Sequence, residues 1–350
     1  MSDKMILAGD IGGTKSYLGL FKMEGSKVRP ITEIKKYPSP SYSSLTALVQ
    51  EFLSYLDKSS LREDEKFIGV ACFGIAGPVE TDKDGKYCKM THPESWPIVK
   101  ESDFSQLLND KPVILLNDLE AMGYGISQLA DKDLVELNHG IPQEGNRAVI
   151  AAGTGLGQVI LHWDGKDHYP SPSEGGHANW ASPYDKDNLY IDLLSHLQKK
   201  FQGNVGVERV LSGEGLVNIY EFLKERGKDG NEPIDWEKRL SKNDPAELIS
   251  QFAKEGNTLC SKALDVFMDI YGATAGDLAL QYLAVGGIYI GGGIALKNLA
   301  ELCDGTFMQA FTAKEKKYPH FTQLNANIPV KVIKNPQVGL LGAAWRAAKT

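Results

Sequence analysis

The sequence predicts an α/β protein of two domains, and three observations support this prediction. First, apolar strand-like runs alternate with segments of helical periodicity, which is typical of a layered α/β fold. Second, the chain has 350 residues, more than a single hydrophobic core usually contains. Third, a unit of strand, glycine-and-threonine turn and strand occurs twice, which indicates internal duplication.

The first of these units begins with the apolar residues 5–8, which predict a buried strand. The chain turns through residues 9–15, and residues 17–21 predict a second strand. Glycine amides can approach phosphate oxygens closely. Asp10 would repel such phosphates unless a divalent cation lay between them. The hairpin therefore predicts a magnesium-nucleotide site, and the alternative is an ordinary tight hairpin in a core sheet.

Further elements follow before the second unit. Leucines, Val49 and Phe52 at i, i+3, i+4 spacing predict an amphipathic helix over residues 45–56, and residues 67–76 and 113–116 predict strands. The latter strand ends in Asn117-Asp118. Ligands of α/β sheets gather at such strand ends, so Asp118 is a candidate general base. The alternative is that Asp118 caps the following helix.

The second unit begins at Arg147. Residues 148–152 and 158–163 predict strands around the turn Gly153-Thr154-Gly155-Leu156-Gly157. A helix-rich region at 245–284, a glycine-rich unit at 286–294 and a strand at 330–333 follow, and Asn335-Pro336 is expected to open a terminal helix. Since no low-complexity linker divides the chain, we expect the domains to interleave, with the C-terminal helix returning to the first one.

Composition and charge exclude several classes of protein. The chain is 42% hydrophobic and 24% charged, as in ordinary globular proteins, and its net charge of −7 argues against a nucleic-acid surface. No stretch reaches the ~20 apolar residues that span a bilayer. The four cysteines are scattered without a CxxC pair, and the N-terminus lacks a signal-peptide pattern. We therefore expect a cytoplasmic protein.

Six motifs lie along the chain at residues 9–14, 116–118, 153–157, 174–177, 208–213 and 290–294. In sequence and in order they resemble the bacterial-type glucokinase family, within the actin-like ATPase and sugar-kinase superfamily. The resemblance extends from about Leu7 to Ala344. It implies a two-domain actin-like (ribonuclease H-like) ATPase fold with an interdomain cleft, a small domain of residues 1–118 plus 332–350, and a large domain of residues 119–331.

The resemblance also implies the reaction and the residues that carry it. The family transfers the γ-phosphoryl of Mg-ATP to the 6-hydroxyl of D-glucose, which makes Asp118 the general base and assigns Mg²⁺ to Asp10, through water. The residues implied to bind the sugar are Asn117, Asp118, Glu174, His177 and Glu208. Those implied to bind the nucleotide are Ala8, Gly9, Asp10, Ile11, Gly12, Gly13, Thr14, Gly153, Thr154, Gly155, Gly291, Gly292 and Gly293.

Structural alternatives stay open for several of these residues. Glu208, expected in an amphipathic helix beside Arg209, has a surface ion pair as its alternative, and Glu174 with His177 could form a metal pair or a structural hydrogen bond. The triplet 291–293 could serve close strand–helix packing. Trp96, in a loop that in the family lies near the sugar, could simply pack. Lys15 could touch phosphate or face solvent.

Other expectations concern metals, partners and rival functions. No structural zinc is expected, because no cysteine lies between Cys88 and Cys260. We expect a homodimer that uses glucose and ATP and binds neither nucleic acid nor membrane. The rival functions are a kinase for another hexose, a non-catalytic sugar-responsive regulator, and an ATPase that moves a protein partner and needs no sugar.

Overall fold

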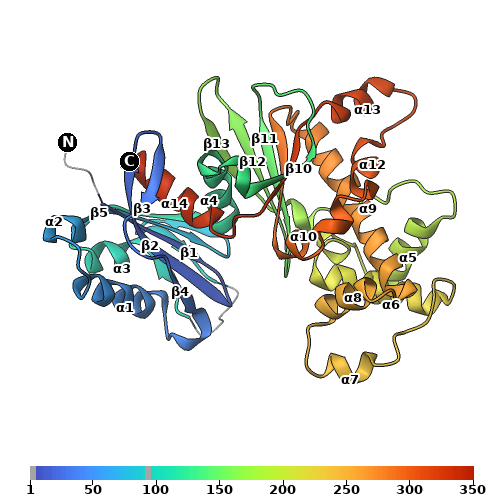
Figure 1. Ribbon diagram of the computed structural model, residues 1–350, viewed down its shortest axis with the longest axis horizontal. Coiled ribbons are helices and arrows are strands. Elements are labelled where there is room, and N and C mark those ends of the chain that lie inside the picture. The colour runs from blue at the N-terminus through green and yellow to red at the C-terminus, as the bar shows by residue number, and fades with distance from the viewer. Residues whose placement is uncertain (1–4, 91–95) are drawn as a thin grey trace. The chain divides into compact units, whose positions relative to one another are not determined.

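The structure is a computed structural model that describes residues 5–90 and 96–350 (Figure 1). The chain forms two compact units. The first runs to Asp133 and also contains Tyr169–Pro172 and Asn335–Thr350, and the second contains Leu134–His168 and Ser173–Lys334. Among the helices of the described residues, none is both long and apolar enough to cross a bilayer.

The first unit is built on a six-stranded sheet of order β3-β2-β1-β5-β9, with β4 added to β2. Strand β1 pairs antiparallel with β2 and parallel with β5, and β5 pairs parallel with β9. A small second sheet joins β6, β7 and β8. The strands are β1 (Met5–Ile11), β2 (Lys15–Glu24), β3 (Lys27–Pro30), β4 (Lys35–Pro38), β5 (Ile68–Ile75), β6 (Val79–Asp82), β7 (Gly85–Cys88), β8 (Val99–Lys100) and β9 (Val113–Asn117).

Helices cover both faces of this sheet, which explains why residues 5–8 are continuously apolar. Leu7 belongs to a core cluster with Phe52 of α1, whereas Ile6 belongs to a separate cluster with Leu340 of α14. The helical segments of the unit are α1 (Leu45–Asp57), α2 (Glu63–Lys66), α3 (Glu101–Leu107), α4 (Asp118–Gly125), α14 (Val338–Ala348) and the 3-10 turns Ser39–Ser41, Ile126–Gln128 and Asp131–Asp133.

The C-terminal helix returns to the first unit, as the sequence predicts. Helix α14 packs against α4 and against β1 and β5 (Figure 1). It begins at Val338, later than expected, because the Asn335 side chain accepts a hydrogen bond from the Gln337 amide and forms a turn. Because α4 packs on α14, the first unit extends past the boundary expected at residue 118. The boundaries of independently folding domains stay a prediction.

The second unit repeats the pairing scheme of the first. Strand β11 pairs antiparallel with β12 and parallel with β14, and β14 pairs parallel with β15. This matches β2-β1-β5-β9 step by step and confirms the predicted duplication at the level of topology. The sheet has the order β10-β15-β14-β11-β12-β13. Its strands are β10 (Leu134–Asn138), β11 (Arg147–Ala152), β12 (Leu156–Trp163), β13 (His168–Ser173), β14 (Gly287–Gly291) and β15 (Val330–Ile333).

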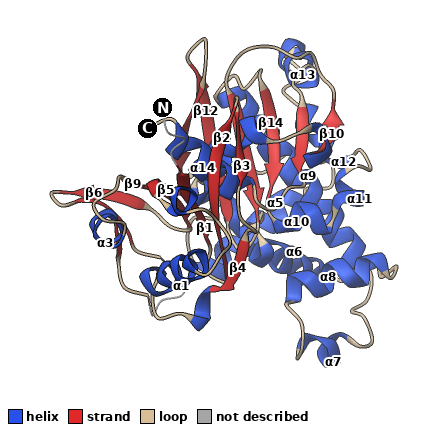
Figure 2. Cartoon of the chain, turned by 60° about the vertical axis from the view of Figure 1, so that its left-hand side comes forward, coloured by secondary structure: helices blue, strands red, loops and turns tan. Residues whose placement is uncertain are grey.

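A helical layer packs beside this sheet (Figure 2). Helices α6, α8 and α9 contact one another and share one hydrophobic cluster with Ile150 of β11 and Ile290 of β14. The helical segments are α5 (Leu189–Phe201), α6 (Gly213–Arg226), α7 (Trp236–Leu240), α8 (Pro245–Lys254), α9 (Thr258–Gln281), α10 (Gly293–Lys297), α11 (Leu299–Leu302), α12 (Thr306–Thr312), α13 (Pro319–Ala326) and the 3-10 turns Gly175–His177 and Val207–Arg209.

Candidate functional site

The first glycine-rich hairpin joins β1 to β2. The strands pair up to Ile11 and Ser16, and the amide of Gly12 donates a 3.1 Å hydrogen bond to the carbonyl oxygen of Lys15. Gly12 is half-buried, whereas Thr14 and Lys15 are exposed. The turn between Ile11 and Ser16 is therefore open to a ligand on the side of Thr14. The Lys15 ammonium lies 5.8 Å from the centre of the Tyr17 ring.

Asp10 lies at the carboxyl end of β1, in the same unit as Asp118. Burial raises the pKa of its carboxyl to about 7, and the negative charge of Asp118 adds to this rise, while Lys15 opposes it. A Cβ on Gly339, in the first turn of α14, would lie 3.0 Å from Asp10 Oδ2, so glycine there leaves room for the carboxylate. Two carboxylates that destabilise each other's charge are a suitable setting for a divalent cation.

Asn117 and Asp118 lie where β9 ends and α4 begins. The side-chain oxygen of Asn117 caps the helix by accepting from the Leu119 amide at 2.9 Å, and its amide nitrogen donates to the carbonyl oxygen of Gly77 at 2.9 Å. Asp118 Oδ1 also accepts from the Leu119 amide, at 2.9 Å. The alternative that Asp118 is the cap residue is therefore wrong, because Asn117 takes that position. Asp118 stands one residue further, on the first turn of α4.

The second glycine-rich hairpin joins β11 to β12. Ala152 pairs with Leu156, and the Gly153 amide donates to the carbonyl oxygen of Gly155 at 2.8 Å across the turn. The carbonyl oxygen of Gly153 in turn accepts a 2.8 Å hydrogen bond from the amide of Gly213, the first residue of α6. Thr154 is exposed, like Thr14 in the first hairpin. Helix α6 thus fixes one side of this turn and leaves Thr154 accessible.

The structure brings three of the sugar-binding candidates onto adjacent segments of the second unit. Glu174 precedes the 3-10 turn Gly175–His177, and His177 ends it. Both side chains are exposed, and Oε2 of Glu174 lies 3.9 Å from Nε2 of His177. Backbone hydrogen bonds from Val207 to Ala178 and from Trp180 to Val205 join this segment to the turn that carries Glu208. Glu174, His177 and Glu208 therefore lie on two backbone segments that are hydrogen-bonded to each other.

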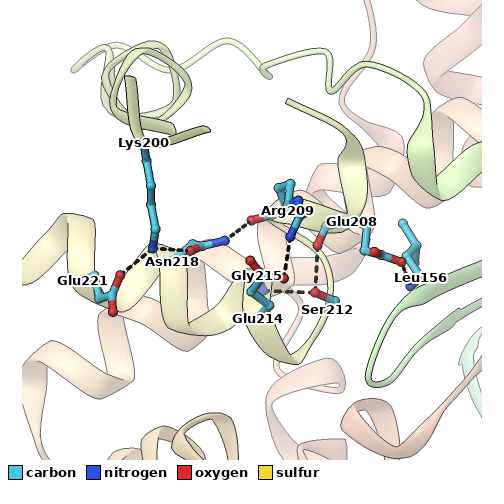
Figure 3. Close-up of polar contacts among 9 residues, drawn as sticks. All are labelled: Leu156, Lys200, Glu208, Arg209, Ser212, Glu214, Gly215, Asn218 and Glu221. Carbon is cyan, nitrogen blue, oxygen red and sulfur yellow. Dashed lines mark hydrogen bonds and ion pairs between the residues drawn. The ribbon is translucent and has the colours of Figure 1, made fainter. Parts of the chain in front are cut away.

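Glu208 itself contacts the second hairpin (Figure 3). Its Oε2 accepts a 2.8 Å hydrogen bond from the backbone amide of Leu156. The expected amphipathic helix is wrong here, since Val207–Arg209 form a 3-10 turn. The Glu208 carboxylate is half-buried and binds Leu156, whereas the neighbouring Arg209 pairs with Glu214. The alternative of a surface ion pair therefore describes Arg209 rather than Glu208.

The third glycine-rich segment follows β14. Gly292 has a φ of +87°, and a Cβ there would lie 2.1 Å from the carbonyl oxygen of Ala152, so close packing alone requires glycine. The packing alternative thus holds for Gly292. At Gly293, by contrast, no atom of the described residues lies within 4 Å of an added Cβ, apart from its chain neighbours and the backbone of its own helix. This open position begins α10 and is the member of the triplet that a ligand could approach.

Two residues that the sequence analysis missed support these turns. Tyr271 of α9 is fully buried, and its hydroxyl bonds to the backbone of Ala152, Ile150 and Gly291 behind the second hairpin. Ser39 is likewise buried and bonds to the backbone of Gly12 in the first hairpin. Tyrosine inside an apolar helix and serine after a short strand carry no motif, so no sequence signal marked either residue.

The tryptophans outside the motifs serve packing. Trp96 is buried in the core of the first unit, and its indole nitrogen donates to the carbonyl oxygen of Tyr42 at 2.8 Å. The residues before it, 91–95, lie outside the described part of the chain, so the loop expected near the sugar is not described. Trp180 is buried, and Trp163 packs on His168.

Within residues 5–90 and 96–350, no group of three or more histidine, cysteine, aspartate or glutamate side chains is placed to hold a metal. This leaves Asp10 with Asp118 as the acidic pair considered for Mg²⁺. Magnesium often takes only one or two protein carboxylates and completes its shell with water and substrate phosphates. The residues present therefore suit a magnesium that arrives with a nucleotide.

The duplicated sheets, the two glycine-threonine hairpins and the polar residues at the end of β9 define a class. They are the features of a two-domain α/β sugar kinase, and solved structures agree. Glucokinase from an Antarctic psychrotroph superposes with a TM-score of 0.82 at 27% identity, over 99% of each chain. A ROK-family glucokinase from Streptomyces griseus, in complex with glucose and AMPPNP, shares the fold with a TM-score of 0.61 at 18% identity, over 99% of this chain and 100% of that one.

Sequence comparison identifies the family. The family model described as Glucokinase matches residues 7–350. A glucokinase from Nostoc sp. is 39% identical over 358 aligned positions that cover 99% of each chain. The chain belongs to the glucokinase family.

Proposed function

We propose that this protein transfers the γ-phosphoryl group of Mg-ATP to the 6-hydroxyl of D-glucose. The observation that carries this proposal is the family match over residues 7–350, which includes every motif that the reaction would use. Members of this family are ATP-dependent hexose kinases, and similar structures are named as complexes with glucose and with an ATP analogue.

Asp118 is proposed as the general base. In the reaction, the 6-oxygen of glucose forms a bond to the γ-phosphorus, the bond from that phosphorus to the bridging oxygen breaks, and ADP leaves. The hydroxyl proton passes to the Asp118 carboxylate. The position of Asp118 on the first turn of α4 suits this role, because a helix N-terminus favours a negative charge.

The sugar-binding candidates come from both units of the chain. Asn117 and Asp118 belong to the first unit, and Glu174, His177 and Glu208 belong to the second. Carboxylates, an amide and an imidazole match hydroxyls that both donate and accept hydrogen bonds. If both groups bind the sugar, Asn117→Ala and His177→Ala must each raise the KM for glucose. A variant that changes neither KM nor kcat would remove its residue from the site.

The two hairpins are proposed to hold the phosphates. Gly12, Gly13 and Thr14 from the first and Gly153, Thr154 and Gly155 from the second would supply amides and hydroxyls, and Gly293 with its neighbours would lie against the adenosine. Asp10 would hold Mg²⁺ through water. When bound, the cation neutralises part of the charge on the phosphates.

The test is sugar-dependent ADP formation from Mg-ATP with glucose, mannose, fructose and N-acetylglucosamine. Glucose should support turnover, and Asp118→Asn should lower kcat by about 10²–10⁴, the usual effect of losing a general base. Asp57→Asn, at the exposed end of α1, is the matched control and should keep wild-type turnover. Preference for another hexose would contradict the assignment of glucose as the substrate, and sugar-independent ADP formation would favour the ATPase alternative.

A cytoplasmic location and a homodimer are also part of the proposal. Cys72, Cys88 and Cys260 are buried free thiols, which suits a reducing compartment. Sedimentation velocity at micromolar concentration tests the oligomeric state, and a single species with the mass of one 38.3 kDa chain would contradict the dimer.

A further inference from the structure

The Glu208 carboxylate is hydrogen-bonded to the backbone of the second hairpin. Its Oε2 accepts the Leu156 amide at 2.8 Å (Figure 3), and a Cβ on Gly155 would lie only 2.6 Å from the same oxygen. Glycine at position 155 therefore leaves room for the carboxylate, which a larger residue would displace. Both contacts join the hairpin to Glu208 on the turn Val207–Arg209, which lies far from the hairpin in the sequence.

The turn that carries Glu208 is itself held against this hairpin. The Ser212 hydroxyl donates to the carbonyl oxygen of Glu208 at 2.7 Å and accepts from the Gly215 amide at 3.0 Å, so it fixes the turn to the start of α6 (Figure 3). The Gly213 amide then bonds to Gly153. Glu208 and α6 thus contact the hairpin on two of its backbone groups.

We infer that Glu208 is a positioning residue that holds the second hairpin in its nucleotide-binding conformation, in addition to contacting the sugar. This inference rests on the proposed function, which assigns phosphates to residues 153–155 and a sugar contact to Glu208. A carboxylate has about four acceptor positions, so the bond to Leu156 leaves capacity for a sugar hydroxyl. One side chain would then serve both substrates.

The inference separates Glu208 from the other sugar-binding candidates. The Glu174 carboxylate lies beside His177 on an exposed turn, so its loss should affect the sugar only. Loss of Glu208 should weaken nucleotide binding even when no sugar is present, because the Leu156 amide loses its acceptor. A residue that only contacts sugar would leave nucleotide binding to the sugar-free protein unchanged.

The experiment measures the Kd of Mg-AMPPNP by calorimetry without glucose. The variants are Glu208→Met and Glu208→Gln, which have similar shape but differ in the ability to accept a hydrogen bond, with Glu174→Met as the control. Glu208→Met should bind about tenfold more weakly than wild type, as expected when one charge-assisted hydrogen bond is lost. Glu208→Gln and Glu174→Met should stay within about twofold of wild type.

Other outcomes contradict the inference. Equal affinity of Glu208→Met and wild type would show that Glu208 does not position the hairpin. Equal weakening in Glu208→Met and Glu208→Gln would assign the effect to charge rather than to the bond with Leu156. If Glu208→Met does not fold, Glu208→Ala is compared with Glu208→Gln under the same criteria.

The binding comparison is independent of turnover. If wild-type protein binds Mg-AMPPNP but forms no ADP with any sugar, the proposed reaction is contradicted, while the positioning role of Glu208 still stands. A wild-type protein that does not bind Mg-AMPPNP at all would overturn both.

Discussion

The hydroxyl of Ser39 donates a 2.6 Å hydrogen bond to the carbonyl oxygen of Gly12, across 27 positions of sequence. The Ser39 amide also donates to the Thr14 carbonyl oxygen, at 3.2 Å. Because the Ser39 hydroxyl has one proton and gives it to Gly12, the Ser16 hydroxyl, 2.9 Å away, must be the donor to Ser39. Strand β4 creates this arrangement by pairing with β2 and ending beside the turn.

Ser39→Ala should loosen the first hairpin. The substitution leaves the buried Ser16 hydroxyl and the Gly12 carbonyl without this partner, which costs about 1–3 kcal/mol of stability, and it should raise the KM for ATP more than the KM for glucose. Ser54→Ala on the exposed face of α1 is the control, since its hydroxyl donates within the helix, to the carbonyl oxygen of Gln50. Steady-state kinetics with each substrate varied in turn would decide, and equal changes in both KM values would argue against a role at the nucleotide.

Asp10 should make stability depend on pH when Mg²⁺ is absent. Its folded-state pKa of about 7 exceeds the ordinary value of 3.8, so between these values the folded protein holds a proton that the unfolded chain releases. Stability from this group is therefore greatest below about pH 4 and is lost as the pH rises through about 7. In EDTA at pH 8, Asp10→Asn should raise Tm by about 2–4 °C relative to wild type, and this difference should vanish near pH 4.

Magnesium with ADP should reverse this order of Tm values and make wild type more stable than Asp10→Asn. The cation compensates the charge of Asp10 in wild type, and the variant has no carboxylate there to bind it. Thermal unfolding at several pH values, with and without Mg-ADP, measures both effects. Asp57→Asn controls for the loss of one surface charge. Parallel Tm curves for wild type and Asp10→Asn across the pH range would show that this carboxyl ionises normally.

Local pattern made the strands and hairpins predictable. Continuous apolar runs that lead into Gly-Asp or Asn-Asp mark buried parallel strands. These runs form β1, which contains Asp10 near its carboxyl end, and β9, which Asp118 follows directly. The same logic recovered the second hairpin and the internal duplication. These features depend on neighbouring residues, so a single sequence contains them.

Contacts that depend on tertiary register were not predictable. The sequence predicts a helical position for Glu208, yet its bond to Leu156 spans 52 positions. The bond depends on tertiary packing, because the turn at 207–209 lies against the turn Gly175–His177, which in turn packs on β12. Ser39 follows a strand of four residues that has no apolar pattern. The capping role of Asn117 was also missed, because Asp118 is an equally good cap by residue type.

Tyr271 offers the last prediction, because one buried hydroxyl connects the ends of β11 and β14. It accepts from the Ala152 amide at 3.3 Å and can give its single proton to the carbonyl oxygen of Ile150 at 3.1 Å or of Gly291 at 3.3 Å. Burial raises the pKa of this phenol, which keeps it neutral and able to donate. The two strand ends lead directly into residues 153–155 and 291–293.

Tyr271→Phe keeps the ring but leaves the Ala152 amide without this acceptor, so we expect a loss of about 1–3 kcal/mol in the free energy of unfolding. Because both segments proposed to bind the nucleotide lose a common anchor, the KM for ATP should rise while the KM for glucose changes little. Tyr190→Phe is the control, since Tyr190 is also buried and donates to Asp269 on α9. It should lower stability without altering either KM. Urea unfolding and steady-state kinetics on the two variants separate the effects, and a Tyr271→Phe protein with wild-type kinetics would restrict the hydroxyl to a role in folding.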